Sequence, residues 1–324
     1  MKNLIKLIVL VSCLISTITY AETQPSVKAT AAILINAETG EVLYSKNPTS
    51  IMAPASTTKI MTAILAIEKS DLNRKIKVSR RAASIPGSSM NLRPGEVQTL
   101  KNLLYGLLLS SGNDAASAIA EYIAGTESKF AKMMTAKAAE LGMKNTCFKN
   151  ASGLPAAGHN TTAYDMALLA TYALKNPVFA EIVQTKTASV RSSRSNRSRY
   201  LKNHNKLLWQ YPYITGIKTG YTRRAGRCLV ASASQNGITL ISVVLKSGTM
   251  YNDTVNLFSY GFQVSPDLIN NDIDNGENIE HTDENNNGNV DDNAITSQTE
   301  SINTEPVQTT ETVQTTEATP MEAE

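Results

Sequence analysis

Ala53-Pro-Ala-Ser-Thr-Thr-Lys59 opens an apolar stretch and is the first of three short strings that decide how this chain folds. The second string is Ser111-Gly-Asn113, and the third is Lys218-Thr-Gly220. Each is weak evidence alone, because a serine three residues before a lysine is expected about once by chance in such a chain. Their order, with spacings of about 55 and then about 107 residues, predicts one site built from distant segments.

Ser56 begins a predicted helix over Ser56–Lys69, so Lys59 lies on the same helix face one turn later. A serine hydroxyl is a poor nucleophile until a base removes its proton, and lysine is a base only when neutral. Desolvation and the positive charge of Lys218 would both lower the pKa of Lys59. The pair predicts an activated nucleophile; the structural alternative is a helix cap followed by a solvated lysine.

Ser111 and Asn113 lie between two predicted helices, Leu100–Leu109 and Asp114–Ala124, where a short loop can project side chains into a cleft. We expect Ser111 to relay a proton from Lys59 toward a leaving group. We expect Asn113 to hydrogen-bond a substrate amide. The structural alternative is a helix break capped by Asn113.

Lys218, Thr219 and Gly220 precede an apolar segment and are expected at the edge of a sheet. An ammonium and a hydroxyl at this place can bind a substrate carboxylate, while the glycine lets the substrate backbone approach closely. The structural alternative is a polar strand start. The strings together predict acyl transfer by a serine nucleophile, without a metal.

The remaining pattern predicts an α/β fold. Thr30–Ala37 with Glu41–Ser45, and Arg227–Ser234 with Ile238–Lys246, have the alternation and turn residues of hairpins. Helical patterns lie between them, including Thr162–Leu174, which opens with a capping-box spacing. We therefore expect an antiparallel sheet formed from both chain ends with an inserted helical lobe.

Three regions are expected: a signal peptide over 1–21, a catalytic domain over 22–262 and an acidic disordered tail over 263–324. The first region has two early lysines, an apolar run of about 14 residues and small residues before a cut after Ala21. An uncleaved anchor is the alternative, but this run is shorter than the ~20 residues that span a bilayer. Lipoprotein processing at Cys13 is disfavoured because the apolar run continues past it.

The charge is divided unevenly along the chain. Residues 263–324 contain fifteen acidic residues and no lysine or arginine, so residues 1–262 carry a balance of +18. The tail composition cannot bury enough apolar surface to fold. A basic exported domain suits an anionic wall or membrane surface, and export disfavours nucleic acid. Cys147 and Cys228 are expected to be free, although the sequence leaves their pairing open.

With its motifs in view, the chain resembles the D-alanyl-D-alanine carboxypeptidases, the low-molecular-weight penicillin-binding proteins. The resemblance covers roughly residues 28–262. Besides the three strings it includes Asn150-Ala-Ser-Gly-Leu154, Thr162-Ala-Tyr-Asp165, Asn203-His-Asn-Lys-Leu-Leu208, Gly216-Ile-Lys-Thr-Gly-Tyr-Thr222 and Leu229-Val-Ala-Ser-Ala233. It implies a β-lactamase/DD-peptidase-like fold, no metal or cofactor, and location in the periplasm or outside the cell at the wall.

The resemblance also implies roles. Ser56 would form the acyl-enzyme, Lys59 would be the general base and Ser111 would pass protons. The backbone N–H groups of Ser56 and Tyr221 would form the oxyanion hole.

The substrate would be held by Asn113, and its terminal carboxylate by Lys218, Thr219 and Gly220. The implied reaction removes the terminal D-alanine from peptidoglycan pentapeptides, with β-lactams as covalent inhibitors. One departure bears on the carboxylate: many relatives carry an arginine after the last strand, and Lys246–Asn252 contains none.

Several alternatives stay open. A class A β-lactamase would need a glutamate that activates the deacylating water, and the four candidates lack that context: Glu121, Glu127, Glu140 and Glu181. An esterase or endopeptidase of the same superfamily would share the acyl-enzyme, as would a transpeptidase. A non-catalytic wall-binding module is a fourth reading. His159 and His204 lack metal-ligand spacing, and the oligomeric state is not specified.

Overall fold

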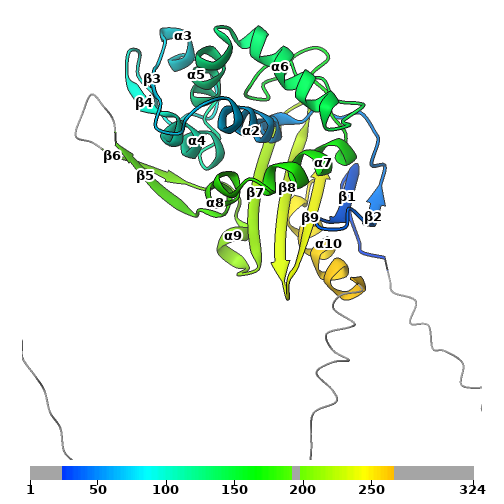
Figure 1. The fold of residues 1–324 in the computed structure, drawn as a ribbon. Helices are drawn as coiled ribbons and strands as arrows, with labels where there is room; N and C mark the ends of the chain where they lie inside the picture. Colours follow the sequence, from blue (N-terminus) through cyan, green and yellow to red (C-terminus); the bar gives the residue numbers. More distant parts are fainter. Residues whose placement is uncertain (1–23, 192–197, 266–324) are drawn as a thin grey trace, which may run out of the picture. The chain divides into compact units, whose positions relative to one another are not determined.

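The computed structural model describes residues 24–191 and 198–265 (Figure 1). A five-stranded antiparallel sheet lies at its centre, in the order β2-β1-β9-β8-β7. The strands come from both ends of the described chain: β1 (Ala31–Asn36), β2 (Val42–Lys46), β7 (Ile214–Thr222), β8 (Gly226–Gln235) and β9 (Ile238–Leu245). The predicted fold class is confirmed, because the helical elements are inserted between β2 and β7. The expected signal peptide and the tail beyond Ser265 lie outside the described residues.

Both predicted hairpins are present. β1 pairs with β2, and β8 pairs with β9, in antiparallel register. The β8–β9 turn contains Asn236 with φ 50° and Gly237 with φ 81°. These positive values are those of the two-residue turns that match the twist of paired strands, and Asn-Gly adopts them readily.

The two faces of the sheet contribute to two hydrophobic clusters. Ile33 and Ile241 belong to the larger cluster, with the helical lobe, α7 (Ala163–Leu174) and α8 (Pro177–Gln184). Leu34 packs instead in the smaller cluster, under α10 (Met250–Val264). Because helices cover both faces, β1 is buried along its whole length, as is typical of a central strand.

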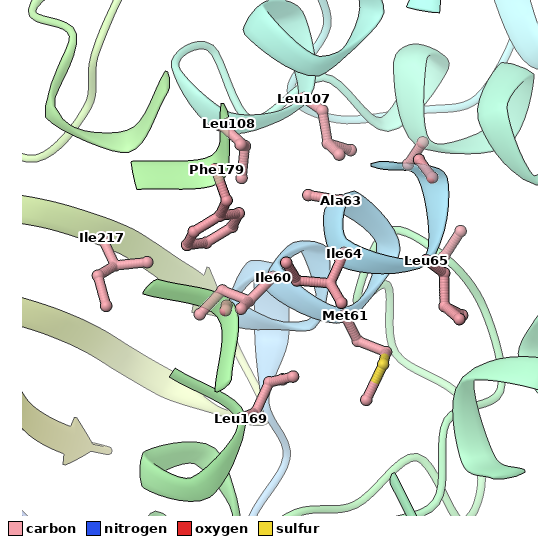
Figure 2. Packing of buried hydrophobic residues seen from close by; sticks show 14 of the residues in the cluster. Ile60, Met61, Ala63, Ile64, Leu65, Leu107, Leu108, Leu169, Phe179 and Ile217 are labelled. Carbon is pink, nitrogen blue, oxygen red and sulfur yellow. The ribbon is translucent and has the colours of Figure 1, made fainter. Parts of the chain in front are cut away.

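The helical lobe surrounds α2 (Lys59–Lys69) with α4 (Leu100–Leu108), α5 (Asn113–Ala124) and α6 (Glu127–Glu140). All residues of α2 from Lys59 to Ala66 are buried. Figure 2 shows the packing around α2, where Ile60 lies among side chains from α7, α8 and β7: Leu169, Phe179 and Ile217. Each fully buried aliphatic side chain contributes about 1.5–3 kcal/mol. Packing of α2 in the larger hydrophobic cluster thus fixes the start of the helix, where Lys59 lies.

The predicted capping box of α7 is half formed. The Thr162 hydroxyl accepts a hydrogen bond from the Asp165 N–H at 3.0 Å. The Asp165 carboxylate does not return to Thr162; it accepts from the Thr146 hydroxyl at 2.7 Å and the Asn145 N–H at 2.9 Å. The cap therefore ties α7 to the preceding loop.

The remaining elements are short: α3 (Arg80–Ala83), α9 (Leu207–Gln210), and two ribbons, β3 (Lys75–Lys77) with β4 (Val97–Thr99) and β5 (Thr187–Arg191) with β6 (Ser198–Lys202). Both described cysteines are free; Cys228 is buried and Cys147 is partly exposed. Within the described ranges, no single helix is long and apolar enough to cross a membrane, and α7 with α8, bent by 107°, passes that test only as a pair.

Candidate active site

Ser56 lies in a single 3₁₀ turn, η1 (Ala55–Thr58), that precedes α2. The expected helix over Ser56–Lys69 therefore begins as this turn and becomes α-helical at Lys59. Ala55 has φ 48°, a left-handed conformation that costs about 1–3 kcal/mol for a residue with a side chain. The surrounding structure must hold this turn in place.

Two glycines enclose the turn. A Cβ atom on Gly153 would come within 1.8 Å of the Ala55 carbonyl oxygen and 3.0 Å of the Ser56 nitrogen. A Cβ atom on Gly220 would lie 3.0 Å from the same nitrogen and 3.2 Å from that of Thr57. Backbone from two distant segments thus packs directly against the residue that carries the candidate nucleophile.

Lys59 contacts the candidate nucleophile directly. Its Nζ lies 3.0 Å from the Ser56 hydroxyl, and it also donates to Asn113 Oδ1 at 2.8 Å and to the Ser152 carbonyl at 2.5 Å. The side chain is fully buried. Three oxygen partners fix the lysine nitrogen beside Ser56, so a proton can pass between the two side chains.

Electrostatics favour a neutral lysine here. Burial, followed by the positive charge of Lys218, holds the pKa of Lys59 well below its ordinary value, while the charge of Asp114 opposes this shift. Burial also lowers the pKa of Lys218 to about 7. The lowered pKa expected for Lys59 therefore has two physical causes, its burial and the charge of the nearby buried Lys218.

The Ser111–Asn113 segment joins α4 to α5. Ser111 is 3% exposed and has φ 58°, a second strained backbone next to the site. In the described part of the chain, no hydrogen bond joins its hydroxyl to Lys59, so the proton relay stays a prediction. The Asn113 amide is engaged on both sides, since Oδ1 accepts from Lys59 and Nδ2 donates to the Pro86 carbonyl at 2.7 Å.

Asp114 braces this loop. Its carboxylate accepts from the backbone N–H groups of Met90 at 3.1 Å and Leu92 at 2.9 Å, and from the Ser89 hydroxyl at 2.6 Å. These bonds attach the 88–92 loop to the first turn of α5. The side chain of Asn113, one residue earlier, is positioned by the same turn.

The third string lies on β7, at the edge of the sheet as expected. Lys218 is 1% exposed, and its Nζ donates to the Thr219 carbonyl at 3.0 Å. Gly220 shares the strand face of Lys218 because strand side chains alternate, and that face meets η1. Thr219 and Tyr221 alternate with them, and the Tyr221 side chain is 64% exposed. The oxyanion hole expected from the backbone N–H groups of Ser56 and Tyr221 stays a prediction.

The Asn203–Leu208 motif supports β7 from the side. Asn205 Nδ2 donates to the Gly216 carbonyl at 2.8 Å, and Asn203 Nδ2 donates to the carbonyls of Val183 and Thr185, both at 3.1 Å. The His204 N–H donates to the Leu109 carbonyl at 3.2 Å. This segment therefore connects the strand of Lys218 to the end of α4.

Sequence reasoning assigned no role to two groups that touch the site. The Asn150 side chain accepts from the Ser152 and Gly153 N–H groups at 3.2 and 2.7 Å, which forms the turn that presents the Ser152 carbonyl to Lys59. The Asn-x-x-Gly spacing is a signal for such a turn. His159 bonds to Thr58 within η1, and no local sequence signal pointed to it.

The four glutamates considered for a deacylating role bond elsewhere. Glu121 and Glu127 lie beside Arg81, with shortest distances of 3.9 and 3.3 Å. Glu140 pairs with Lys137, and Glu181 accepts from the Tyr105 hydroxyl. None of them contacts Ser56 or Lys59 among the described residues.

In this geometry the buried Lys59 contacts a serine three residues earlier, and a second buried lysine, Lys218, lies on the adjacent strand. The profile of the family described as D-alanyl-D-alanine carboxypeptidase matches residues 18–249. The chain belongs to this family. The predicted resemblance is confirmed.

Individual relatives are consistent with this family membership. The chain is 44% identical over 227 residues to the D-alanyl-D-alanine carboxypeptidase DacF of Bacillus subtilis, which covers 68% of this chain and 58% of DacF. It is 38% identical to DacC of Escherichia coli, covering 74% of this chain and 62% of DacC. The chain thus spans about three fifths of the length of these two relatives.

Solved structures share the fold. The DD-transpeptidase of Streptomyces K15 superposes with a TM-score of 0.71 at 31% identity, covering 75% of this chain and 100% of that one. A D-alanyl-D-alanine carboxypeptidase of Mycobacterium tuberculosis gives a TM-score of 0.73 at 31% identity, covering 76% and 96%. Figure 1 shows the arrangement behind this likeness, a sheet with a helical lobe on one side and α10 on the other.

Proposed function

We propose that this protein is a serine-type D-Ala-D-Ala carboxypeptidase that removes the terminal D-alanine from peptidoglycan pentapeptides through an acyl-enzyme on Ser56. One observation carries the proposal: Lys59 Nζ lies 3.0 Å from the Ser56 hydroxyl, in a site whose burial lowers the pKa of that lysine well below its ordinary value. Family membership supports the choice of substrate.

In this mechanism neutral Lys59 takes the proton of Ser56 as the hydroxyl attacks the carbonyl of the penultimate D-alanine. The oxyanion forms next to the Ser56 nitrogen, against which Gly220 packs. Backbone N–H donors there, from Ser56 and Tyr221, would each contribute about 3 kcal/mol to the transition state. Lys59, directly or through Ser111, returns the proton to the leaving D-alanine, and water then hydrolyses the ester.

The terminal carboxylate is assigned to Lys218, with help from Thr219. A carboxylate beside Lys218 favours the ammonium form, which the buried site otherwise disfavours. Because the bound carboxylate offsets the charge of Lys218, the lowered pKa of Lys59 in the complex rests chiefly on burial.

We assign the enzyme to the outside of the cytoplasmic membrane, at the wall, because the predicted signal peptide and the substrate both require export. β-Lactams would acylate Ser56 as substrate mimics. The class A β-lactamase alternative is disfavoured, since the four candidate glutamates bond to other groups.

The test is labelling with a fluorescent penicillin together with D-alanine release from a soluble pentapeptide. Wild type should be labelled and should release D-alanine, whereas Ser56→Ala should do neither. Ser70→Ala, just beyond the far end of α2, is the matched control and should behave as wild type. Labelling without D-alanine release would contradict the carboxypeptidase proposal, and rapid turnover of the penicillin would favour a β-lactamase.

A further inference from the structure

The β5–β6 ribbon presents one exposed face that carries cations and an aromatic ring. Cross-strand pairs Thr187–Lys202, Ser189–Tyr200 and Arg191–Ser198 share this face, and Tyr200 is 68% exposed. The other face holds Val190 and Leu201, which are 3% and 2% exposed. Figure 1 shows the ribbon projecting from the body beside α8 and α9.

The exposed face continues onto α9. Trp209 is 44% exposed, and the ammonium groups of Lys202 and Lys186 lie 5.0 and 5.9 Å from the centre of its ring. Such contacts hold the ammonium groups at the surface while leaving their charge available. We name this surface the ribbon strip and define it by six residues: Lys186, Arg191, Tyr200, Lys202, Lys206 and Trp209.

The positive charge of the ribbon strip has no acidic partner in the described ranges. None of its four cationic residues pairs with a described carboxylate, whereas Arg199 on the opposite ribbon face pairs with buried Glu96. A surface with four unneutralised cations and two exposed aromatic rings is suited to a partner that is anionic and has apolar faces.

The ribbon strip leads to the candidate active site. A hollow of about 520 Å³ beside Trp209 is lined by Lys202, Asn203, His204 and Lys206. The backbone of His204 bonds to Leu109, two residues before Ser111. A molecule extended along the strip would thus come close to the loop that helps to form the site.

We propose that the ribbon strip binds an uncross-linked peptidoglycan strand, the polymer that carries the peptide consumed at Ser56. This rests on the proposed function. Sugar rings of the glycan pack on Tyr200 and Trp209, and the free carboxylates of neighbouring stem peptides pair with the lysines and Arg191. The strip therefore raises activity on polymeric substrate and does not take part in the chemistry on the peptide end.

The experiment measures D-alanine release from two substrates, uncross-linked polymeric peptidoglycan and a soluble pentapeptide. The triple variant Lys186→Gln/Tyr200→Ser/Lys202→Gln should lose about tenfold in kcat/KM on the polymer, which corresponds to about 1.4 kcal/mol. Its release from the pentapeptide and its penicillin acylation should stay within about twofold of wild type, which also shows that it folds. The matched control is Lys129→Gln/Lys132→Gln/Tyr164→Ala, three exposed residues elsewhere on the lobe and α7.

Equal losses on both substrates, or no loss on the polymer, would overturn the proposal. Co-sedimentation with isolated peptidoglycan or with anionic lipid vesicles distinguishes a membrane as the other possible occupant. If the variants lose binding to the vesicles but keep binding to peptidoglycan, the strip is assigned to a membrane instead. If wild type releases no D-alanine from either substrate, the proposed function fails. Strip-dependent sedimentation with peptidoglycan would still support the binding surface in that case.

Discussion

The Nε2 atom of His159 lies 3.0 Å from the Thr58 hydroxyl, inside the turn that separates Ser56 from Lys59. The backbone N–H of Lys149 donates to the other ring nitrogen at 3.3 Å. Nδ1 therefore has no proton, and Nε2–H donates to Thr58. The neutral imidazole connects the loop that precedes α7 to the turn of the nucleophile.

This relationship predicts acid lability. Burial, followed by the charge of Lys149, lowers the pKa of His159 to about 4, below the 6.5 of the unfolded chain. The unfolded state binds the proton first, so stability is complete above pH 6.5 and falls by roughly 3 kcal/mol by pH 4. In urea unfolding, His159→Gln should be less stable than wild type at neutral pH. The difference between their free energies of unfolding should narrow toward pH 4. A difference independent of pH would contradict the prediction.

How much of this site the sequence could predict depends on where each signal lies. The proximity of Ser56, Lys59 and Lys218 could be predicted because these side-chain types occur in a recognisable order and spacing; their roles stay a proposal. The Ser152 carbonyl could not, because a backbone oxygen has no residue signature. His159 is 101 residues from Thr58, and only the fold brings them together. The β1–β2 and β8–β9 hairpins followed from local alternation, whereas the polar β5–β6 ribbon depends on a distant partner, Glu96.

The pKa of Lys59 predicts opposite effects of two substitutions. Acylation requires neutral Lys59, so the rate falls on the acid side through this pKa. Lys218→Gln removes a positive charge near Lys59, so the acid-side fall of the acylation rate should move to higher pH. Asp114→Asn removes a negative charge, so the same fall should move to lower pH. The check is the pH dependence of fluorescent-penicillin acylation. Shifts in the same direction for both variants would exclude the proposed coupling.

The pKa of Lys218 predicts that kcat/KM falls on the alkaline side of its pH profile. In the free enzyme this pKa is about 7, and the carboxylate of the substrate needs the charged form. The kcat/KM for a peptide ester with a free terminal carboxylate should therefore fall as pH rises above about 7. The same ester with that carboxylate amidated should bind weakly and lack this alkaline fall. An identical alkaline fall for both compounds would assign it to another group.

Glycine substitutions separate strain from contact. Gly153→Ala combines φ 86° with a Cβ 1.8 Å from the Ala55 carbonyl, so it should destabilise the fold by several times the ~1–2 kcal/mol of left-handed strain alone. Gly237→Ala, with φ 81° and open space around it, is the matched control for strain. In thermal unfolding, Gly153→Ala should have a clearly lower Tm than Gly237→Ala. Equal costs would mean that the η1 turn relaxes away from the loop.

Gly220→Ala should affect catalysis more than stability. Its φ is not in the left-handed region, and the new Cβ would lie 3.0 Å from the Ser56 nitrogen, a tight contact that a shift of a few tenths of an ångström relieves. That shift would move the proposed oxyanion donor, so acylation should slow by about 10- to 100-fold, less than the loss of a whole donor. Stopped-flow acylation and urea unfolding measure both effects. A stable variant that acylates at the wild-type rate would place the oxyanion elsewhere.

The ion pair between Glu96 and Arg199 predicts how the ribbon is held. Glu96 is fully buried, accepts from Gln98 Nε2 at 2.7 Å and from Arg199 Nη2 at 2.6 Å. Glu96→Gln leaves the largely buried guanidinium of Arg199 without its charge partner, which typically costs about 3–5 kcal/mol. The double variant Glu96→Leu/Arg199→Met should recover most of that loss in urea unfolding, because neither charge is then buried alone. The pair joins the ribbon to the loop before β4 and does not contact Ser56. In Glu96→Gln, hydrogen exchange should therefore rise in β5 and β6, while penicillin acylation should persist. Loss of acylation in step with ribbon exchange would mean that the ribbon also supports the catalytic site.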